Sequence, residues 1–156
     1  DRGSALRVVE AAPDMPLEAG TVYIAPGDFH MEVVRRGTAV TTSLNTGPPE
    51  NFCRPSVDVL FGSVGDAYQR AAVVVVLTGM GRDGLKGCER IREMGGQVIC
   101  QDEASSVVWG MAGFVAHAGL AERAAGAGDR PVVPGPAERA LGARGRDGLR
   151  GDARAL

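Results

Sequence analysis

The sequence is poor in aromatic residues and contains no hydrophobic run long enough to span a membrane. Aromatic residues make up 4% of the 156 residues whereas glycine occurs 23 times, a balance that indicates many turns or an unstructured portion. No hydrophobic run approaches the roughly 20 residues that span a bilayer, and no signal peptide is recognisable. We therefore expect no membrane insertion. The formal net charge of −2 gives no reason to expect nucleic acid as a partner.

Cysteine is too sparse for a disulfide framework or a zinc site. Cys53, Cys88 and Cys100 are odd in number, and no two of them form a C-x-x-C pair. We expect reduced thiols in a cytoplasmic protein, with no metal and no cofactor.

One hydrophobic run organises the middle of the chain. Residues 73–77 (VVVVL) are almost entirely β-branched, which is typical of a strand buried on both faces of a parallel sheet. The loop that follows, residues 78–84 (TGMGRDG), contains three glycines and a single carboxylate, Asp83. Apolar residues at helical spacing then predict a helix over residues 85–94. In open α/β sheets, functional groups gather at the carboxyl ends of such strands.

Strands and helices are indicated on both sides of this run. We expect a strand over 21–25, an edge hairpin from 30–35 and 39–42, a helix capped by Ser56, a strand over 97–101, and a helix over 107–118 interrupted at Gly110 and Gly113. This alternation predicts an α/β protein with a doubly wound, mostly parallel sheet. Residues 121–156 are dominated by Ala, Gly, Arg, Asp and Pro, so we expect a poorly ordered tail after a domain formed by residues 1–120.

Asp83 has two interpretations from its chemistry alone. It is either an N-cap that complements the dipole of the following helix or a carboxylate that orients a catalytic histidine. A phosphate-binding interpretation of the loop is weaker, because the loop lacks the Walker lysine and its own carboxylate repels anions.

Four segments together resemble one known family. They are VYIAPGDFHMEV, GPPENFCRPSVDVLFGSV, VVVLTGMGRDGLKG and QDEASSVVWGM. In this order they resemble the catalytic domain of the protein-glutamate methylesterases of bacterial chemotaxis, from about Leu6 to Leu120. The resemblance implies hydrolysis of glutamate methyl esters on chemoreceptors, and in some members glutamine deamidation, by a Ser-His-Asp triad. Asp83 matches the triad aspartate, and Met80 matches the residue whose backbone N–H serves the oxyanion hole.

The other two triad residues of the family have no counterpart in this sequence. The family serine lies in a G-x-S-x-G-G segment that the chain does not contain, and the family histidine follows that segment. We therefore expect the C-terminal part of a catalytic domain, incomplete at its N-terminal half and inactive alone. Because asparagine caps helices nearly as well as aspartate, we expect Asp83→Asn to leave the fold intact.

Other serines and histidines have simpler roles than catalysis. Ser56, Ser105 and Ser106 precede predicted helices and are interpreted as N-caps. His30 is interpreted as a structural or site-rim residue, and His117 as complementing a helix dipole. Two other functions stay open: a non-catalytic fragment that binds a partner, and a small-ligand or nucleotide site at the loop of residues 78–84.

Overall fold

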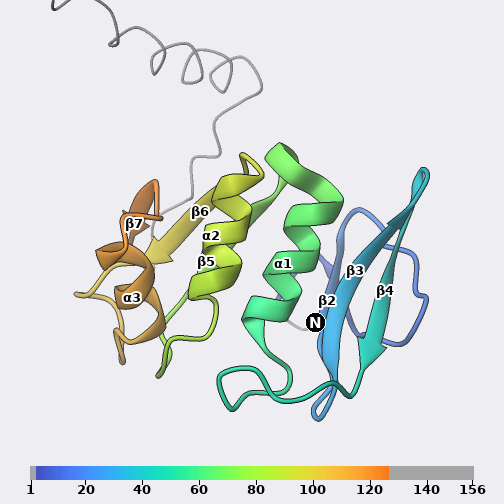
Figure 1. Ribbon diagram of the computed structural model, residues 1–156, viewed down its shortest axis with the longest axis horizontal. Helices are drawn as coiled ribbons and strands as arrows, with labels where there is room; N and C mark the ends of the chain where they lie inside the picture. The colour runs from blue at the N-terminus through green and yellow to red at the C-terminus, as the bar shows by residue number, and fades with distance from the viewer. Residues whose placement is uncertain (1–2, 127–156) are drawn as a thin grey trace, which may run out of the picture.

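The computed structural model describes residues 3–126, in which four strands precede the first helix and helices then alternate with strands (Figure 1). The elements are β1 (Arg7–Glu10), β2 (Thr21–Ile24), β3 (His30–Arg36), β4 (Ala39–Asn45), α1 (Val57–Tyr68), the 3-10 helix η1 (Gln69–Ala71), β5 (Val73–Val76), α2 (Leu85–Glu93), β6 (Gln97–Gln101), α3 (Met111–His117) and β7 (Arg123–Ala125). Their order confirms the predicted α/β class.

The main sheet is parallel and has the strand order β5-β6-β7. All five residues of β6, the central strand, are buried, as expected for a parallel strand covered on both faces. The hydrophobic core lies between this sheet and the helices, with Cys88, Ile91, Val98 and Val115 fully buried.

Strand β5 differs from the prediction in its burial. Val74 and Val76 are buried, but Val75 is 46% exposed and the following Leu77 is 61% exposed. The prediction of burial on both faces is therefore wrong for the described residues. Val73 and Val75 lie on the face of β5 that the described residues leave partly open, and β5 is also an edge strand among residues 3–126.

The predicted hairpin forms, but it does not extend the parallel sheet. β3 and β4 pair with each other from His30↔Asn45 to Arg36↔Ala39 and make a separate two-stranded sheet. In Figure 1 helix α1 lies between this hairpin and α2. The Ser63 hydroxyl of α1 accepts a hydrogen bond from the Val33 N–H of β3 at 2.9 Å, so α1 packs on the hairpin.

Two further differences lie near the end of the described residues. Helix α3 begins at Met111 rather than at residue 107, and Gly113 is buried inside it without breaking it. β7 lies at 123–125, within the segment that the sequence analysis assigned to the tail. The rest of that predicted tail, residues 127–156, lies outside the described residues.

Candidate active site

Asp83 lies in the loop between β5 and α2, is only 6% exposed, and is held by donors from the start of α1. The Ser56 hydroxyl donates to Asp83 Oδ1 at 2.6 Å, and the Val57 N–H donates to Oδ2 at 2.7 Å. Two longer hydrogen bonds reach Oδ1, from Asn51 Nδ2 at 3.2 Å and from the Asp58 N–H at 3.3 Å. The carboxylate therefore caps α1, a helix whose first residue precedes Asp83 by 26 residues.

The helix that follows Asp83 is capped differently from the prediction. α2 begins at Leu85 after Gly84, which has φ 93° and provides no side-chain hydrogen bond. The interpretation of Asp83 as the N-cap of its own helix is therefore wrong. Glycine at this position permits the left-handed backbone that turns the loop into the helix.

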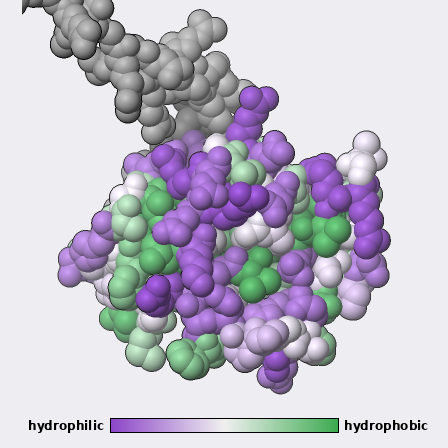
Figure 2. Space-filling model, viewed as in Figure 1, coloured by the Kyte–Doolittle hydropathy of each residue, from purple (hydrophilic) through white to green (hydrophobic). Residues whose placement is uncertain are grey.

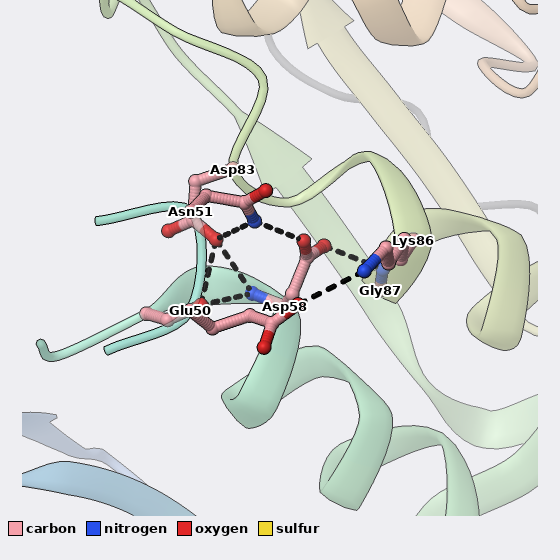
Figure 3. Close-up of polar contacts among 7 residues, drawn as sticks. Glu50, Asn51, Asp58, Asp83, Lys86 and Gly87 are labelled. Carbon is pink, nitrogen blue, oxygen red and sulfur yellow. Dashed lines mark hydrogen bonds and ion pairs between the residues drawn. The ribbon is translucent and has the colours of Figure 1, made fainter. Parts of the chain in front are cut away.

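Each of the two helices is capped by a carboxylate from outside it. Asp83, in the loop before α2, caps α1, and Asp58, in the first turn of α1, caps α2 (Figure 3). Asp58 Oδ1 accepts the Gly87 N–H at 2.7 Å, and its Oδ2 accepts Asn51 Nδ2 at 2.7 Å. The Asn51 amide group thus lies between two buried carboxylates, Asp58 and Asp83, and donates to both (Figure 3). This bridge relieves the repulsion between two like charges that share a site.

A close approach of α1 and α2 makes this exchange possible. A Cβ on Gly87 would lie 2.6 Å from Phe61 Cβ, so only glycine fits between the helices. At the solvent-exposed rim, Lys86 Nζ forms an ion pair with Glu50 Oε1 at 2.9 Å (Figure 3). Exposed pairs of this kind contribute little to stability because solvent screens them, so the buried network carries most of the stabilisation here.

The network keeps Asp83 ionised. Burial opposes the charged form, but the hydrogen bonds from the Ser56 hydroxyl, the Val57 N–H and the Asn51 amide together hold the pKa of Asp83 below its ordinary value. Among residues 3–126, Oδ2 accepts only the Val57 N–H, which leaves it a lone pair for one further donor. A buried, ionised carboxylate with one acceptor site left is what a histidine-orienting aspartate requires.

Ser56, His30 and Asp83 come together in the structure without forming a catalytic triad. The Ser56 hydroxyl donates to Asp83 and accepts the Asp58 N–H at 3.2 Å, as the predicted N-cap of α1. His30 does not contact that hydroxyl: its Nδ1 accepts the Ser56 backbone N–H at 3.3 Å and its Nε2 donates to Pro48 O at 3.0 Å. With both ring nitrogens occupied, His30 has no nitrogen available to act as a base for Ser56, and its predicted structural role fits this geometry.

The loop around Met80 is held by the segment that precedes α3. The Gly79 N–H donates to Val108 O at 3.0 Å, and Gly79 O accepts the N–H groups of Gly110 and Met111. A Cβ on Gly110 would lie 2.6 Å from Gly79 O and 3.2 Å from Met80 Cα. Among residues 3–126 the Met80 N–H has no hydrogen-bond acceptor. The structure thus presents a fixed backbone donor at this loop.

The remaining candidates lie in structural positions. Ser105 and Ser106 do not cap α3, whose N-cap is Gly110, so their predicted N-cap role is wrong. The Ser106 hydroxyl donates to Asp102 O at 2.6 Å, and the Ser105 N–H donates to Asp102 Oδ1 at 2.8 Å. Both serines therefore close a tight loop after β6. His117 lies in the last turn of α3, as predicted, with its ring edge-on to Trp109.

The sequence as a whole matches a family of known proteins. A family model described as CheB methylesterase matches residues 1–129. The chain belongs to the CheB methylesterase family. This membership confirms the resemblance that the four motifs indicated.

Individual CheB relatives are similar over the same region. A protein-glutamate methylesterase/protein-glutamine glutaminase of Trichodesmium erythraeum is 57% identical over 116 residues, which are 74% of this chain and 33% of that protein. A protein of the same name from Nocardioides sp. is 56% identical over 123 residues, which are 79% of this chain and 34% of that protein. The chain spans about a third of the length of these relatives.

A solved CheB structure has the same fold. The crystal structure of the Thermotoga maritima CheB methylesterase catalytic domain matches with a TM-score of 0.72 and 36% sequence identity. The match covers 74% of this chain and 61% of that one.

The described residues contain neither a cluster of metal-ligating side chains nor a membrane-spanning helix. No group of three metal-ligating side chains occurs within residues 3–126. No helix in this region is long and apolar enough to cross a bilayer.

Sequence reasoning missed Asn51 and Asp58, which complete the site. Asn51 lies in one of the four motifs, but its spacing gives no sign that it contacts Asp83, 32 residues away. Asp58 is an ordinary acidic residue of a first helical turn, and its contact with Gly87 depends on how two helices pack.

Proposed function

We propose that this chain supplies the aspartate and one oxyanion donor of a Ser-His-Asp hydrolase that cleaves glutamate methyl esters. The observation that carries the proposal is the state of Asp83, which is buried, ionised and held by α1, with one lone pair of Oδ2 free among the described residues. In a triad the aspartate holds the imidazole in the correct tautomer and stabilises its cation.

The Met80 N–H has the second role. A fixed backbone donor stabilises the negative charge that develops on the ester carbonyl oxygen in the tetrahedral intermediate. The absence of an acceptor for this N–H among residues 3–126 and the hydrogen bonds that fix Gly79 support the assignment. The serine nucleophile and the histidine base belong to the part of the family domain that this sequence does not contain.

The names of the relatives suggest the substrate class. Both relatives named above are protein-glutamate methylesterases/protein-glutamine glutaminases. We accordingly propose γ-glutamyl methyl esters on a cytoplasmic segment of a chemoreceptor as substrate, with glutamine deamidation as a related reaction at the same site. The proposed location is the cytoplasm.

A second candidate is a non-catalytic module that binds a partner through exposed hydrophobic residues. Met80 is 87% exposed and Val107 is 90% exposed. Hydrophobic residues reach the surface at the lower left of Figure 2, where Figure 1 has the loops that follow β5 and precede α3. Exposed apolar surface of this kind is typical of interaction sites.

Hydrolysis of a methylated receptor peptide, measured as methanol release, separates the two functions. We expect no release by this chain alone, because nucleophile and base are missing. Release is expected once the chain is joined to the preceding residues of the Trichodesmium erythraeum relative. An inactive joined domain that folds cooperatively and still binds the peptide would favour the non-catalytic module.

A further inference from the structure

His30, the first residue of β3, is buried to 2% exposure with both ring nitrogens in hydrogen bonds. Pro48 O can only accept, so His30 Nε2 carries the ring proton. The Ser56 backbone N–H can only donate, so Nδ1 is the acceptor. The partners thus define one neutral tautomer and give each nitrogen a separate contact.

The Nδ1 contact acts on the residue that orients Asp83. Ser56 is the N-cap of α1, with extended backbone (φ −111°, ψ 139°), so its own N–H lies outside the helical hydrogen bonds. His30 provides the acceptor for this N–H. The Ser56 hydroxyl, fixed on the same residue, makes the shortest of the hydrogen bonds to Asp83, at 2.6 Å.

We propose that His30 is a positioning residue for Asp83 and acts through Ser56. His30 Nδ1 fixes the Ser56 backbone, and the Ser56 hydroxyl then fixes the carboxylate so that the free lone pair of Oδ2 keeps one direction. The consequence for catalysis rests on the proposed function. The effect on the carboxylate itself does not, because it is a property of this chain.

Two substitutions separate the two nitrogens of His30. Asparagine places an acceptor near the position of Nδ1, so His30→Asn keeps a partner for the Ser56 N–H. Glutamine places an amide NH₂ near the position of Nε2, so His30→Gln keeps the hydrogen bond to Pro48 O and removes the acceptor for Ser56. If His30 only held the loop at Pro48, His30→Asn would perturb the protein more than His30→Gln, because only glutamine keeps the hydrogen bond to Pro48 O.

The readouts are the titration of the Asp83 carboxyl carbon by NMR and the hydrogen-exchange rate of the Ser56 amide, both measured in the 156-residue chain. We expect His30→Gln to raise the pKa of Asp83 and to speed Ser56 exchange by at least tenfold. His30→Asn should leave both close to those of the unaltered chain. Ser56→Ala should also raise the pKa of Asp83, because it removes the hydroxyl donor directly.

Ser63→Ala is the matched control. It removes another hydrogen bond to β3, from the Val33 N–H to the Ser63 hydroxyl, and Ser63 lies in α1 seven residues after Ser56. This variant should lower thermal stability without changing the Asp83 titration. The proposal is overturned if His30→Gln leaves the titration unchanged, if His30→Asn perturbs it more than His30→Gln does, or if Ser63→Ala shifts it equally.

Failure of this proposal is distinct from failure of the proposed function. An unchanged Asp83 titration in His30→Gln removes the role of His30 and leaves the triad assignment intact. Full turnover of an Asp83→Asn variant in the joined domain removes the triad assignment and leaves the role of His30 in place.

Discussion

Asp83→Asn should destabilise this chain substantially, contrary to the expectation from helix-cap preferences. Both carboxylate oxygens accept short hydrogen bonds, from the Ser56 hydroxyl at 2.6 Å and from the Val57 N–H at 2.7 Å. An asparagine has one acceptor oxygen, so its NH₂ group must face one of these donors. The favourable orientation keeps the oxygen at the Oδ1 position, where three donors converge, and turns the NH₂ group toward Val57.

The cost follows from the hydrogen bonds that the asparagine amide cannot make. A hydrogen bond to a charged group contributes about 1.5–3 kcal/mol, and a buried donor left without an acceptor costs a similar amount. The bonds to Oδ1 also weaken when their acceptor becomes neutral. We therefore expect Asp83→Asn to lower the free energy of unfolding by about 2–4 kcal/mol at pH 7, a large fraction of the stability of a small domain.

The effect should depend on pH with a defined sign. The pKa of Asp83 is lowered in the folded chain, so its contribution to the free energy of unfolding is complete above the pKa of the unfolded chain, about 3.9. That contribution is lost as the pH falls through the lower, folded value. The difference between the unaltered chain and Asp83→Asn should thus narrow between pH 7 and pH 3.

Urea unfolding followed by circular dichroism, at one protein concentration, measures this difference. Asp66→Asn is the control, because Asp66 is an exposed carboxylate paired with Arg90, and its loss should change the free energy of unfolding far less than Asp83→Asn does. Equal stability of Asp83→Asn and the unaltered chain at pH 7, or a difference that does not change by pH 3, would refute the reasoning.

Three further predictions concern the rest of the fold. Cys53 is the exposed thiol, whereas burial raises the pKa of Cys88 to about 12. One thiol per native chain should therefore react rapidly with a thiol reagent at pH 8, and three should react after denaturation. Fast modification of a second thiol in the native chain would contradict the buried positions. Gly110→Ala should lower the melting temperature, because its Cβ meets the backbone of the loop after β5. Gly62→Ala should not lower it, because its Cβ meets nothing within 4 Å. Equal melting temperatures of the two variants would contradict the close approach at Gly110. Val75 is exposed on a strand that lies at the sheet edge among residues 3–126, so the chain should self-associate in light-scattering measurements and Val75→Lys should reduce the apparent mass. A monomeric unaltered chain would contradict this.

Local features of the sequence predicted much of the fold. Ser56 predicted the start of α1, and the apolar spacing predicted that α2 ends near residue 94, where Gly95 follows at φ 80°. These features depend on the backbone preferences of neighbouring residues. Their prediction needed no knowledge of how the elements pack.

The parts that failed depend on tertiary contacts. The burial of β5 was misjudged because four valines look alike whether or not their second face is covered, and Val75 is exposed. The capping role of Asp83 was assigned to the helix next in sequence, whereas its donors come from a helix that precedes it. β7 has too few apolar residues to be recognised, and its pairing with β6 defines it.

The most direct test of the account is turnover in the joined domain, comparing Asp83→Asn with Ser56→Ala. Both variants weaken the same capping network, but only Asp83→Asn removes the carboxylate that would orient a histidine. If Asp83 is a triad member, Asp83→Asn should lower kcat by about 10⁴-fold, the loss known for this change in a serine protease, while Ser56→Ala lowers it by about tenfold. Melting curves of both variants, recorded at the assay pH, establish how much of each is folded. Losses of equal size in two folded variants, or unchanged turnover in Asp83→Asn, would contradict the assignment of Asp83 to catalysis.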